Sequence, residues 1–139
     1  MKVDINTIEE FFFIGVAGAG MSALAQYIAG MGKRVSGSDR YFSSEVMSEI
    51  QVKLQETGVR CFKQDGEGIT ADTGLVVVST AVEDTVYEVQ KAKQLGIPIL
   101  KRSELLAQIV RGRKTIAVGG TSGKSTTSAM LFDILCHAG

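Results

Sequence analysis

Continuous apolar segments alternate with segments of helical periodicity along most of the chain. Residues 11–16 and 75–78 read FFFIGV and LVVV, without polar interruption, which is typical of parallel strands covered on both faces. The second of these segments is the most strand-like and is expected near the middle of the sheet. Shorter strands are predicted at residues 34–37, 59–62 and 97–100. Apolar positions spaced three and four apart predict helices at residues 21–28, 44–56, 83–95 and 103–110.

This alternation predicts the fold class. Strands that alternate with helices at short spacing imply right-handed crossovers and an α/β, Rossmann-like, doubly wound and mainly parallel sheet, which we assign to residues 1–110. The chain turns polar at residues 111–113, and a further strand at 114–118 and a helix from Lys124 are predicted beyond it. Residues 111–139 supply too little apolar surface for a core, so we expect them to be the truncated start of a second domain.

Charge and targeting features narrow the classes of partner. The 139 residues include fifteen basic and fifteen acidic side chains, and no basic cluster exceeds two consecutive residues. Nucleic-acid and membrane-surface binding are therefore not expected. No apolar run approaches the roughly 20 residues of a membrane span, and no signal peptide is visible. With only two cysteines, this predicts a cytoplasmic protein without membrane insertion.

A glycine-rich turn follows the first predicted strand. Residues 18–23 fit the pattern G-x-G-x-x-A, and Gly15 precedes them at the end of the strand. Glycines allow the backbone to approach a ligand, and the first N–H groups of the next helix point at it, so the turn predicts a diphosphate site. Ser38 and Asp39 stand about 20 residues downstream, where polar groups contact a ribose or base. NAD, FAD and UDP-sugars all fit these features.

A second glycine-rich turn spans residues 119–127 and ends in Gly123, Lys124 and Ser125, which is typical of a P-loop. In such a loop the backbone binds the phosphates of ATP, the lysine reaches the β- and γ-phosphates and the serine hydroxyl binds Mg²⁺. Valine at position 118 replaces the first glycine of the full pattern, so the loop is a shorter variant. Two phosphate sites favour an enzyme that joins a nucleotide-linked substrate to ATP chemistry over a simple dehydrogenase.

Five segments resemble the Mur ligase family, most closely the branch that joins L-alanine to UDP-N-acetylmuramate. Serine at position 122 departs from this branch and from the related murein-tripeptide recycling ligases, which usually carry histidine there. Both branches therefore stay open, as do a non-catalytic nucleotide-binding regulatory module and an NAD-binding domain. The matching segments follow the expected order at residues 13–22, 36–39, 77–82, 97–106 and 120–127.

The resemblance implies a three-domain peptidoglycan ligase. ATP would phosphorylate the carboxylate of the UDP-muramoyl substrate, and the amine of L-alanine would attack the acyl phosphate; this chain would bind the UDP-sugar without turnover. UDP-sugar binding is assigned to Gly15, Gly18, Ala19, Gly20, Met21, Ser22, Ser38, Asp39, Ser79, Thr80, Ala81 and Arg102. ATP binding is assigned to Gly120, Thr121, Ser122, Gly123, Lys124, Ser125, Thr126 and Thr127. Lys124 and Ser125 are the expected catalytic residues, and Ser125 the expected Mg²⁺ ligand.

Overall fold

The sheet is entirely parallel. A computed structural model describes residues 2–42 and 45–139 and contains one five-stranded sheet in the order β3-β2-β1-β4-β5. All four strand pairs in it are parallel. The predicted Rossmann-like α/β class is thereby confirmed. The strands are β1 (Glu10–Ile14), β2 (Arg34–Asp39), β3 (Val59–Lys63), β4 (Leu75–Val78) and β5 (Ile99–Lys101).

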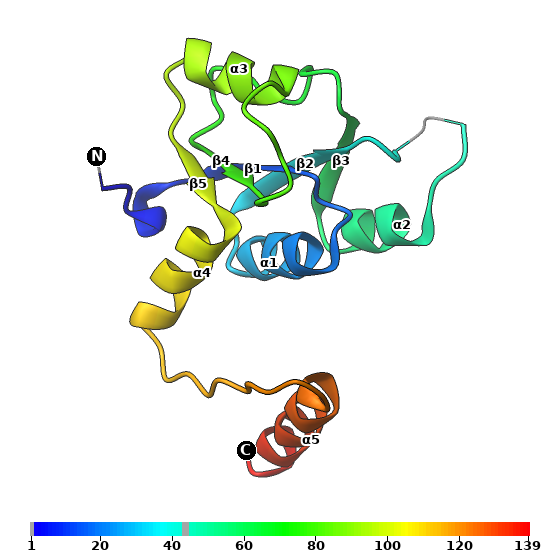
Figure 1. Cartoon of the computed structure of the whole chain (residues 1–139), viewed down its shortest axis with the longest axis vertical. Coiled ribbons are helices and arrows are strands. Elements are labelled where there is room, and N and C mark those ends of the chain that lie inside the picture. The colour runs from blue at the N-terminus through cyan, green and yellow to red at the C-terminus, as the bar shows by residue number, and fades with distance from the viewer. Residues whose placement is uncertain (1, 43–44) are drawn as a thin grey trace.

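Helices cover both faces of the sheet, as a doubly wound fold requires. Helices α1, α2 and α4 lie on one face and α3 on the other, while α5 lies apart from the sheet (Figure 1). None of the helices within residues 2–42 and 45–139 has the length and apolar character of a membrane span. The helices are η1 (Ile5–Thr7, a 3-10 turn), α1 (Ala19–Gly30), α2 (Glu49–Glu56), α3 (Tyr87–Gln94), α4 (Arg102–Arg111) and α5 (Lys124–His137).

Two helices are shorter than their periodicity predicts. Helix α2 was expected from position 44, which lies outside the described residues, but it begins at Glu49 because the Ser48 side chain accepts the Gln51 N–H and caps it. Helix α3 was expected from residue 83, whereas residues 84–86 form a turn and a bend before Tyr87. Apolar spacing locates both helices but not their first turns: a side-chain cap sets the start of α2, whereas α3 begins at Tyr87 without one.

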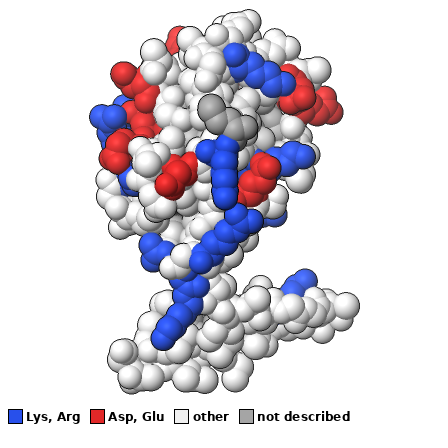
Figure 2. Space-filling model, turned by 90° about the vertical axis from the view of Figure 1, so that its left-hand side faces the viewer, with Lys and Arg blue, Asp and Glu red and all other residues white. Residues whose placement is uncertain are grey.

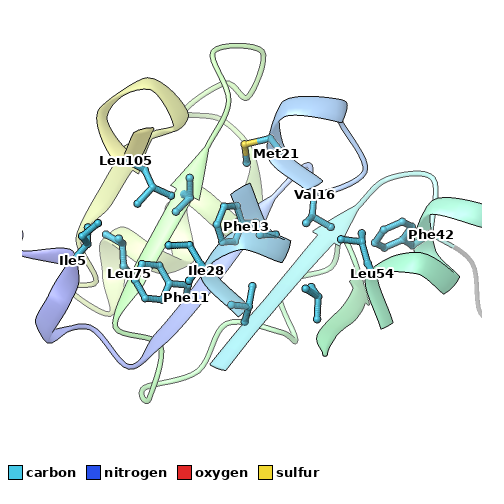
Figure 3. Packing of buried hydrophobic residues seen from close by; sticks show 14 residues of the cluster. Ile5, Phe11, Phe13, Val16, Met21, Ile28, Phe42, Leu54, Leu75 and Leu105 are labelled. Atoms are coloured by element: carbon cyan, nitrogen blue, oxygen red, sulfur yellow. The ribbon is translucent and has the colours of Figure 1, made fainter. Parts of the chain in front are cut away.

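The central strand β1 is buried on both sides. Phe11 and Phe13 pack with Met21 and Ile28 of α1 and Leu105 of α4 (Figure 3). On the opposite face, Phe12 and Ile14 pack in a second cluster that includes residues of α3. The three phenylalanines are 0% exposed, and burying each contributes about 1.5–3 kcal/mol. The apolar run FFFI therefore fixes the middle of the sheet and, with it, the start of the turn at Gly15.

The C-terminal segment does not form a second folded unit. The strand predicted at residues 114–118 is wrong: no strand forms there, because none in the described chain lies beside it to supply hydrogen-bond partners. From Arg111 onward no residue is buried, and α5 exposes Met130, Phe132, Ile134 and Leu135. On the face drawn in Figure 2, the lower part of the molecule, which contains α5, shows few charged side chains, and those are basic, whereas the part above it shows both signs.

Gly37→Ala tests how closely the first turn approaches β2. A Cβ at position 37 would lie 2.7 Å from Val16 Cβ and 2.8 Å from the Phe13 carbonyl oxygen. Neither atom can move without the backbone, so we expect the free energy of unfolding to fall by about 1–3 kcal/mol in urea denaturation. Gly30→Ala is the control, because Gly30 is the last residue of α1 and a Cβ there would have no atom within 4 Å. Equal stability of both variants would contradict the close approach.

Candidate functional site

A cleft opens at the carboxyl ends of β1 and β4. These neighbouring strands connect to helices on opposite faces of the sheet, and ligands of open α/β sheets bind at such a switch point. The turn after β1 and the segment after β4 meet here around a cleft of about 440 Å³. The residues that line it are Gly15, Ala17, Gly18, Asp39, Arg40, Tyr41, Gln64, Ser79, Ala81, Val82 and Val86.

The first glycine turn presents unpaired N–H groups. Gly15 adopts a φ of 79°, and Gly18 is the N-cap of α1, with no side-chain cap. The Ser22 N–H donates to the Gly18 carbonyl at 2.8 Å, so the N–H groups of residues 19–21 precede the first intrahelical bond. No acidic side chain lies in this first turn of α1. The helix end is therefore a partial positive charge that is open to an anion.

The end of β2 holds this turn in place. The Ser38 carbonyl accepts the N–H groups of Gly15 at 2.8 Å and Val16 at 3.0 Å. The Asp39 carboxylate accepts the Ala17 N–H through Oδ2 at 3.1 Å and the Tyr41 N–H through Oδ1 at 3.0 Å. Asp39 is only 6% exposed, so both carboxylate oxygens serve the protein backbone. Asp39 borders the cleft as predicted, but its observed contacts position the loops on either side.

Arg102 brings a positive charge to the same helix end. It is the first residue of α4, and its guanidinium lies so close to Gly20 that a Cβ at position 20 would overlap it. The side chain is exposed and its far end can move. The first turn of α1 and the Arg102 guanidinium thus form one positive region, assembled from two helices that are far apart in the sequence.

Several side chains assigned to the UDP-sugar point elsewhere. Met21 belongs to the core at 2% exposed, and the Ser22 hydroxyl donates to the Ala19 carbonyl at 3.1 Å. The Ser38 hydroxyl is fully buried against Glu88. Thr80 is exposed but is not among the residues that line the cleft, whereas Ser79 and Ala81 are. Met21 can therefore serve a ligand only through its backbone N–H.

Three polar residues of the cleft were missed from the sequence. The Arg40 guanidinium lies 4.8 Å from the centre of the Tyr41 ring and donates to its hydroxyl at 2.9 Å. Tyr41 is 72% exposed, and Gln64, just after β3, lines the same cleft. The available signal was their position directly after the carboxyl ends of β2 and β3, where the loops of a parallel sheet line its crevice.

The second glycine turn also precedes a helix, but no other element of the described chain packs around it. Gly120 and Gly123 have φ values of 140° and 74°, and α5 begins at Lys124. The Thr127 N–H donates to the Gly123 carbonyl at 3.0 Å, which leaves the N–H groups of residues 124–126 without an intrahelical partner. All residues from 120 to 127 are exposed, and none lines the cleft at the sheet. The structure therefore does not join the two glycine turns into one site.

A larger cleft, of about 660 Å³, lies between the N-terminal segment and α4. Its wall mixes Lys2 and Arg111 with Asp4 and Glu104. None of the residues assigned to a ligand from the sequence lines it, and it has neither a glycine turn nor a strand switch point. The smaller cleft remains the candidate site because its chemistry, and not its size, matches a diphosphate.

A family model matches the part of the chain that forms the sheet. The model described as "Mur ligase family, catalytic domain" matches residues 10–114, which is more than half of the chain. The chain belongs to the Mur ligase family. The resemblance found in the sequence is thereby confirmed, and the match includes the whole sheet together with the cleft.

Curated relatives of this Mur ligase chain are named UDP-N-acetylmuramate–L-alanine ligase. The protein of Carboxydothermus hydrogenoformans is 45% identical over 136 residues, which are 97% of this chain and 28% of that protein. The protein of Mesorhizobium japonicum is 38% identical over 130 residues, which are 94% of this chain and 27% of that protein. The chain therefore spans little more than a quarter of the relatives it matches.

Solved structures of two Mur ligase branches share the fold. The UDP-N-acetylmuramate-alanine ligase of Thermotoga maritima superposes with a TM-score of 0.81 at 30% identity, over 93% of this chain and 29% of that one. A murein peptide ligase of Psychrobacter arcticus gives 0.77 at 27% identity, over 94% of this chain and 27% of that one. The fold of this chain is thus common to solved ligases of both branches.

Asp39→Asn tests the positioning role of this carboxylate. The variant keeps one acceptor oxygen but turns an NH₂ group toward a backbone N–H, so we expect the free energy of unfolding to fall by about 1–3 kcal/mol. Hydrogen exchange of the Ala17 amide should accelerate in parallel. Asp84→Asn is the control, because Asp84 is 87% exposed and only pairs with Lys93 at the surface. An unchanged Ala17 exchange rate would show that Asp39 does not hold the turn.

Proposed function

We propose that residues 1–110 bind UDP-N-acetylmuramate in the cleft, as the front end of an ATP-dependent ligase that joins L-alanine to this sugar. The observation that carries the proposal is the positive region formed by the first turn of α1 and Arg102. It suits a diphosphate, which would accept the N–H groups of residues 19–21 and pair with the guanidinium. The names of the curated relatives support this choice of sugar and amino acid.

The cleft offers different surfaces to the two ends of such a ligand. Arg40, Tyr41 and Gln64 lie on the side of β2 and β3, and would face the uridine with a flat aromatic surface and an amide. The side of the cleft at the junction of β1 and β4 would face the sugar, and it is lined by Gly15, Ser79, Ala81 and Val82. In this arrangement the chain's own residues bind and orient the substrate.

The contacts of Asp39 argue against a direct hydrogen bond between this carboxylate and a ribose, whether of a UDP-sugar or of NAD. In dinucleotide-binding domains an acidic residue at this place hydrogen-bonds the ribose. Here both oxygens of the carboxylate already accept backbone N–H groups, and the residue is 6% exposed. A ribose would have to displace the bonds that hold the glycine turn.

We further propose that residues 111–139 begin the ATP-binding domain. The exposed N–H groups at the start of α5, with Gly123 in the left-handed region and Lys124 beside it, suit the phosphates of ATP. When bound, ATP would supply the phosphoryl group that activates the carboxylate of the sugar. Lys124 would stabilise the negative charge of that phosphoryl group, and the Ser125 hydroxyl would bind Mg²⁺. With no buried residue in this segment, the chain itself would bind the UDP-sugar without turnover.

Murein-tripeptide ligation is the second candidate, favoured by the similarity to the murein peptide ligase of Psychrobacter arcticus. Both reactions use the same cleft for the UDP-sugar and differ in the amine that is added. Assays of the full-length protein with L-alanine and with the tripeptide separate the two. Product with the tripeptide alone would replace the L-alanine proposal.

Titration calorimetry of the chain with UDP-N-acetylmuramate and with NAD⁺ tests the binding proposal. We expect a response to the UDP-sugar alone, and a loss of about tenfold in affinity for Arg102→Ala, because a charge-assisted hydrogen bond to the diphosphate is removed. Arg111→Ala, at the other end of α4, is the matched control and should bind as the parent does. Tight NAD⁺ binding without a UDP-sugar response would overturn the proposal. Binding of a regulatory ligand of another class in place of the UDP-sugar would overturn it too.

Lys124→Ala in the full-length ligase tests the division of labour between the two glycine turns. Amide formation should be lost, since the lysine stabilises charge on the transferring phosphoryl group. UDP-sugar affinity, measured by calorimetry on the same variant, should stay within about twofold, because Lys124 begins α5, which lies apart from the sheet that carries the cleft. A comparable loss of both would contradict separate phosphate sites.

A further inference from the structure

Glu88, in the first turn of α3, is a fully buried acidic residue that is hydrogen-bonded to Ser38. It is 0% exposed, and its Oε2 lies 2.6 Å from the Ser38 hydroxyl, which is equally buried. Oε1 is buried too and has no hydrogen-bond partner among the described residues. A carboxylate in this position would be a buried charge without a counter-ion, which is far more costly than the neutral acid.

The burial of Glu88 favours its protonated form. Burial raises the pKa of Glu88 above its ordinary value of 4.5, and the negative charge of Asp65 acts in the same direction. The Ser38 hydroxyl, the Gly66 backbone and the Gln64 side chain oppose this rise in pKa more weakly. The neighbouring cation on α3, Lys91, donates to the Gly66 carbonyl at 2.6 Å and so is engaged with the loop.

Ser38 links Glu88 to the glycine turn. Its side chain bonds to Glu88 on one side of β2, while its carbonyl accepts the N–H groups of Gly15 and Val16. The next residue, Asp39, accepts the N–H groups of Ala17 and Tyr41. The hydrogen bonds that join the turn to β2 therefore come from two consecutive residues, and the first of them is anchored by Glu88.

We propose that protonated Glu88 is a positioning residue, which holds Ser38 and thereby the glycine turn in the geometry that binds the UDP-sugar, and that its ionisation weakens this binding. The inference rests on the proposed function and adds that the protonation state of Glu88 regulates binding at the same site. An ionised Glu88 would draw the donors nearest to it, the Gly66 N–H and the Gln64 amide, toward itself. Gln64 lines the cleft, so its wall would change together with the turn.

The first test needs no ligand. Amide signals of Gly15, Val16 and Ala17, followed by NMR from about pH 5 to about 9, should shift together with one midpoint above 4.5, the range in which buried glutamic acids titrate. The carboxyl carbon of Glu88 should report the same midpoint. In Ser38→Ala this carbon should still titrate while the three amides no longer follow it. If the three amide signals of the parent chain do not shift with the titration of Glu88, the positioning role is overturned.

The second test measures affinity. If only the protonated form has the competent cleft, UDP-N-acetylmuramate affinity falls about tenfold for each pH unit above the Glu88 midpoint. Glu88→Gln is neutral at every pH and should show no such fall, whereas Glu56→Gln, at the exposed end of α2, should keep the parent's profile. A pH-dependent fall that persists in Glu88→Gln would overturn the inference. If the parent binds no UDP-sugar at any pH while the amides follow Glu88, the proposed function fails and the positioning role remains.

Stability provides a check on Glu88→Gln itself. The unfolded chain releases the Glu88 proton near 4.5, but the folded chain retains it up to its raised pKa. Unfolding is therefore increasingly favoured as pH rises from 4.5 to that raised pKa, and the urea midpoint of the parent should fall across this window and level off above it. Glu88→Gln should lack this decline. A variant that merely misfolds would instead lose its cooperative transition at every pH.

Discussion

The turn after β1 is held by hydrogen bonds to the last two residues of β2, and the cleft depends on this attachment. The Ser38 carbonyl accepts two N–H groups of the turn, and the Asp39 carboxylate accepts a third. Gly37, one residue earlier, leaves the space that Val16 occupies. These contacts direct the first turn of α1 toward the cleft and fix where Tyr41 leaves the strand. A loop rich in glycine has many conformations, and the neighbouring strand selects one of them.

The two glycine turns differ in whether a packed core holds the helix start in place. The first follows a strand of fully buried phenylalanines and precedes a helix whose Met21, Ala25 and Ile28 pack on that strand. The second precedes a helix with no buried residue and follows a segment without strand pairing. Both helix starts offer unpaired N–H groups, but only the first is held against neighbouring side chains. Preorganisation of this kind lowers the entropy lost when a ligand binds.

The residues of the candidate site were foreseen in part. Glycine spacing identified the first turn, and position at the end of the second strand identified Asp39. The resemblance to Mur ligases identified Ser79 and Ala81, which also line the cleft. Side-chain direction was foreseen less well, because Met21 and Ser22 fall on the buried side of α1 and Ser38 on the α3 side of β2. Arg40, Tyr41 and Gln64 belong to no motif that the sequence analysis recognised. Their place in the cleft follows from the parallel order of β2 and β3 relative to β1.

The sequence by itself determined the strands of the sheet, the places of the helices and the two glycine turns, because each depends on local periodicity or on backbone freedom within a few residues. It did not determine the first turns of α2 and α3, and it wrongly predicted a strand at residues 114–118. It also identified the family, since five motifs in a fixed order are specific. Only the tertiary structure decided that the Arg102 guanidinium lies against Gly20, that both oxygens of Asp39 serve the backbone, and that Glu88 is buried on Ser38. Such contacts join elements distant in sequence, and their partners are chosen by how helices pack on the sheet, which no local pattern records.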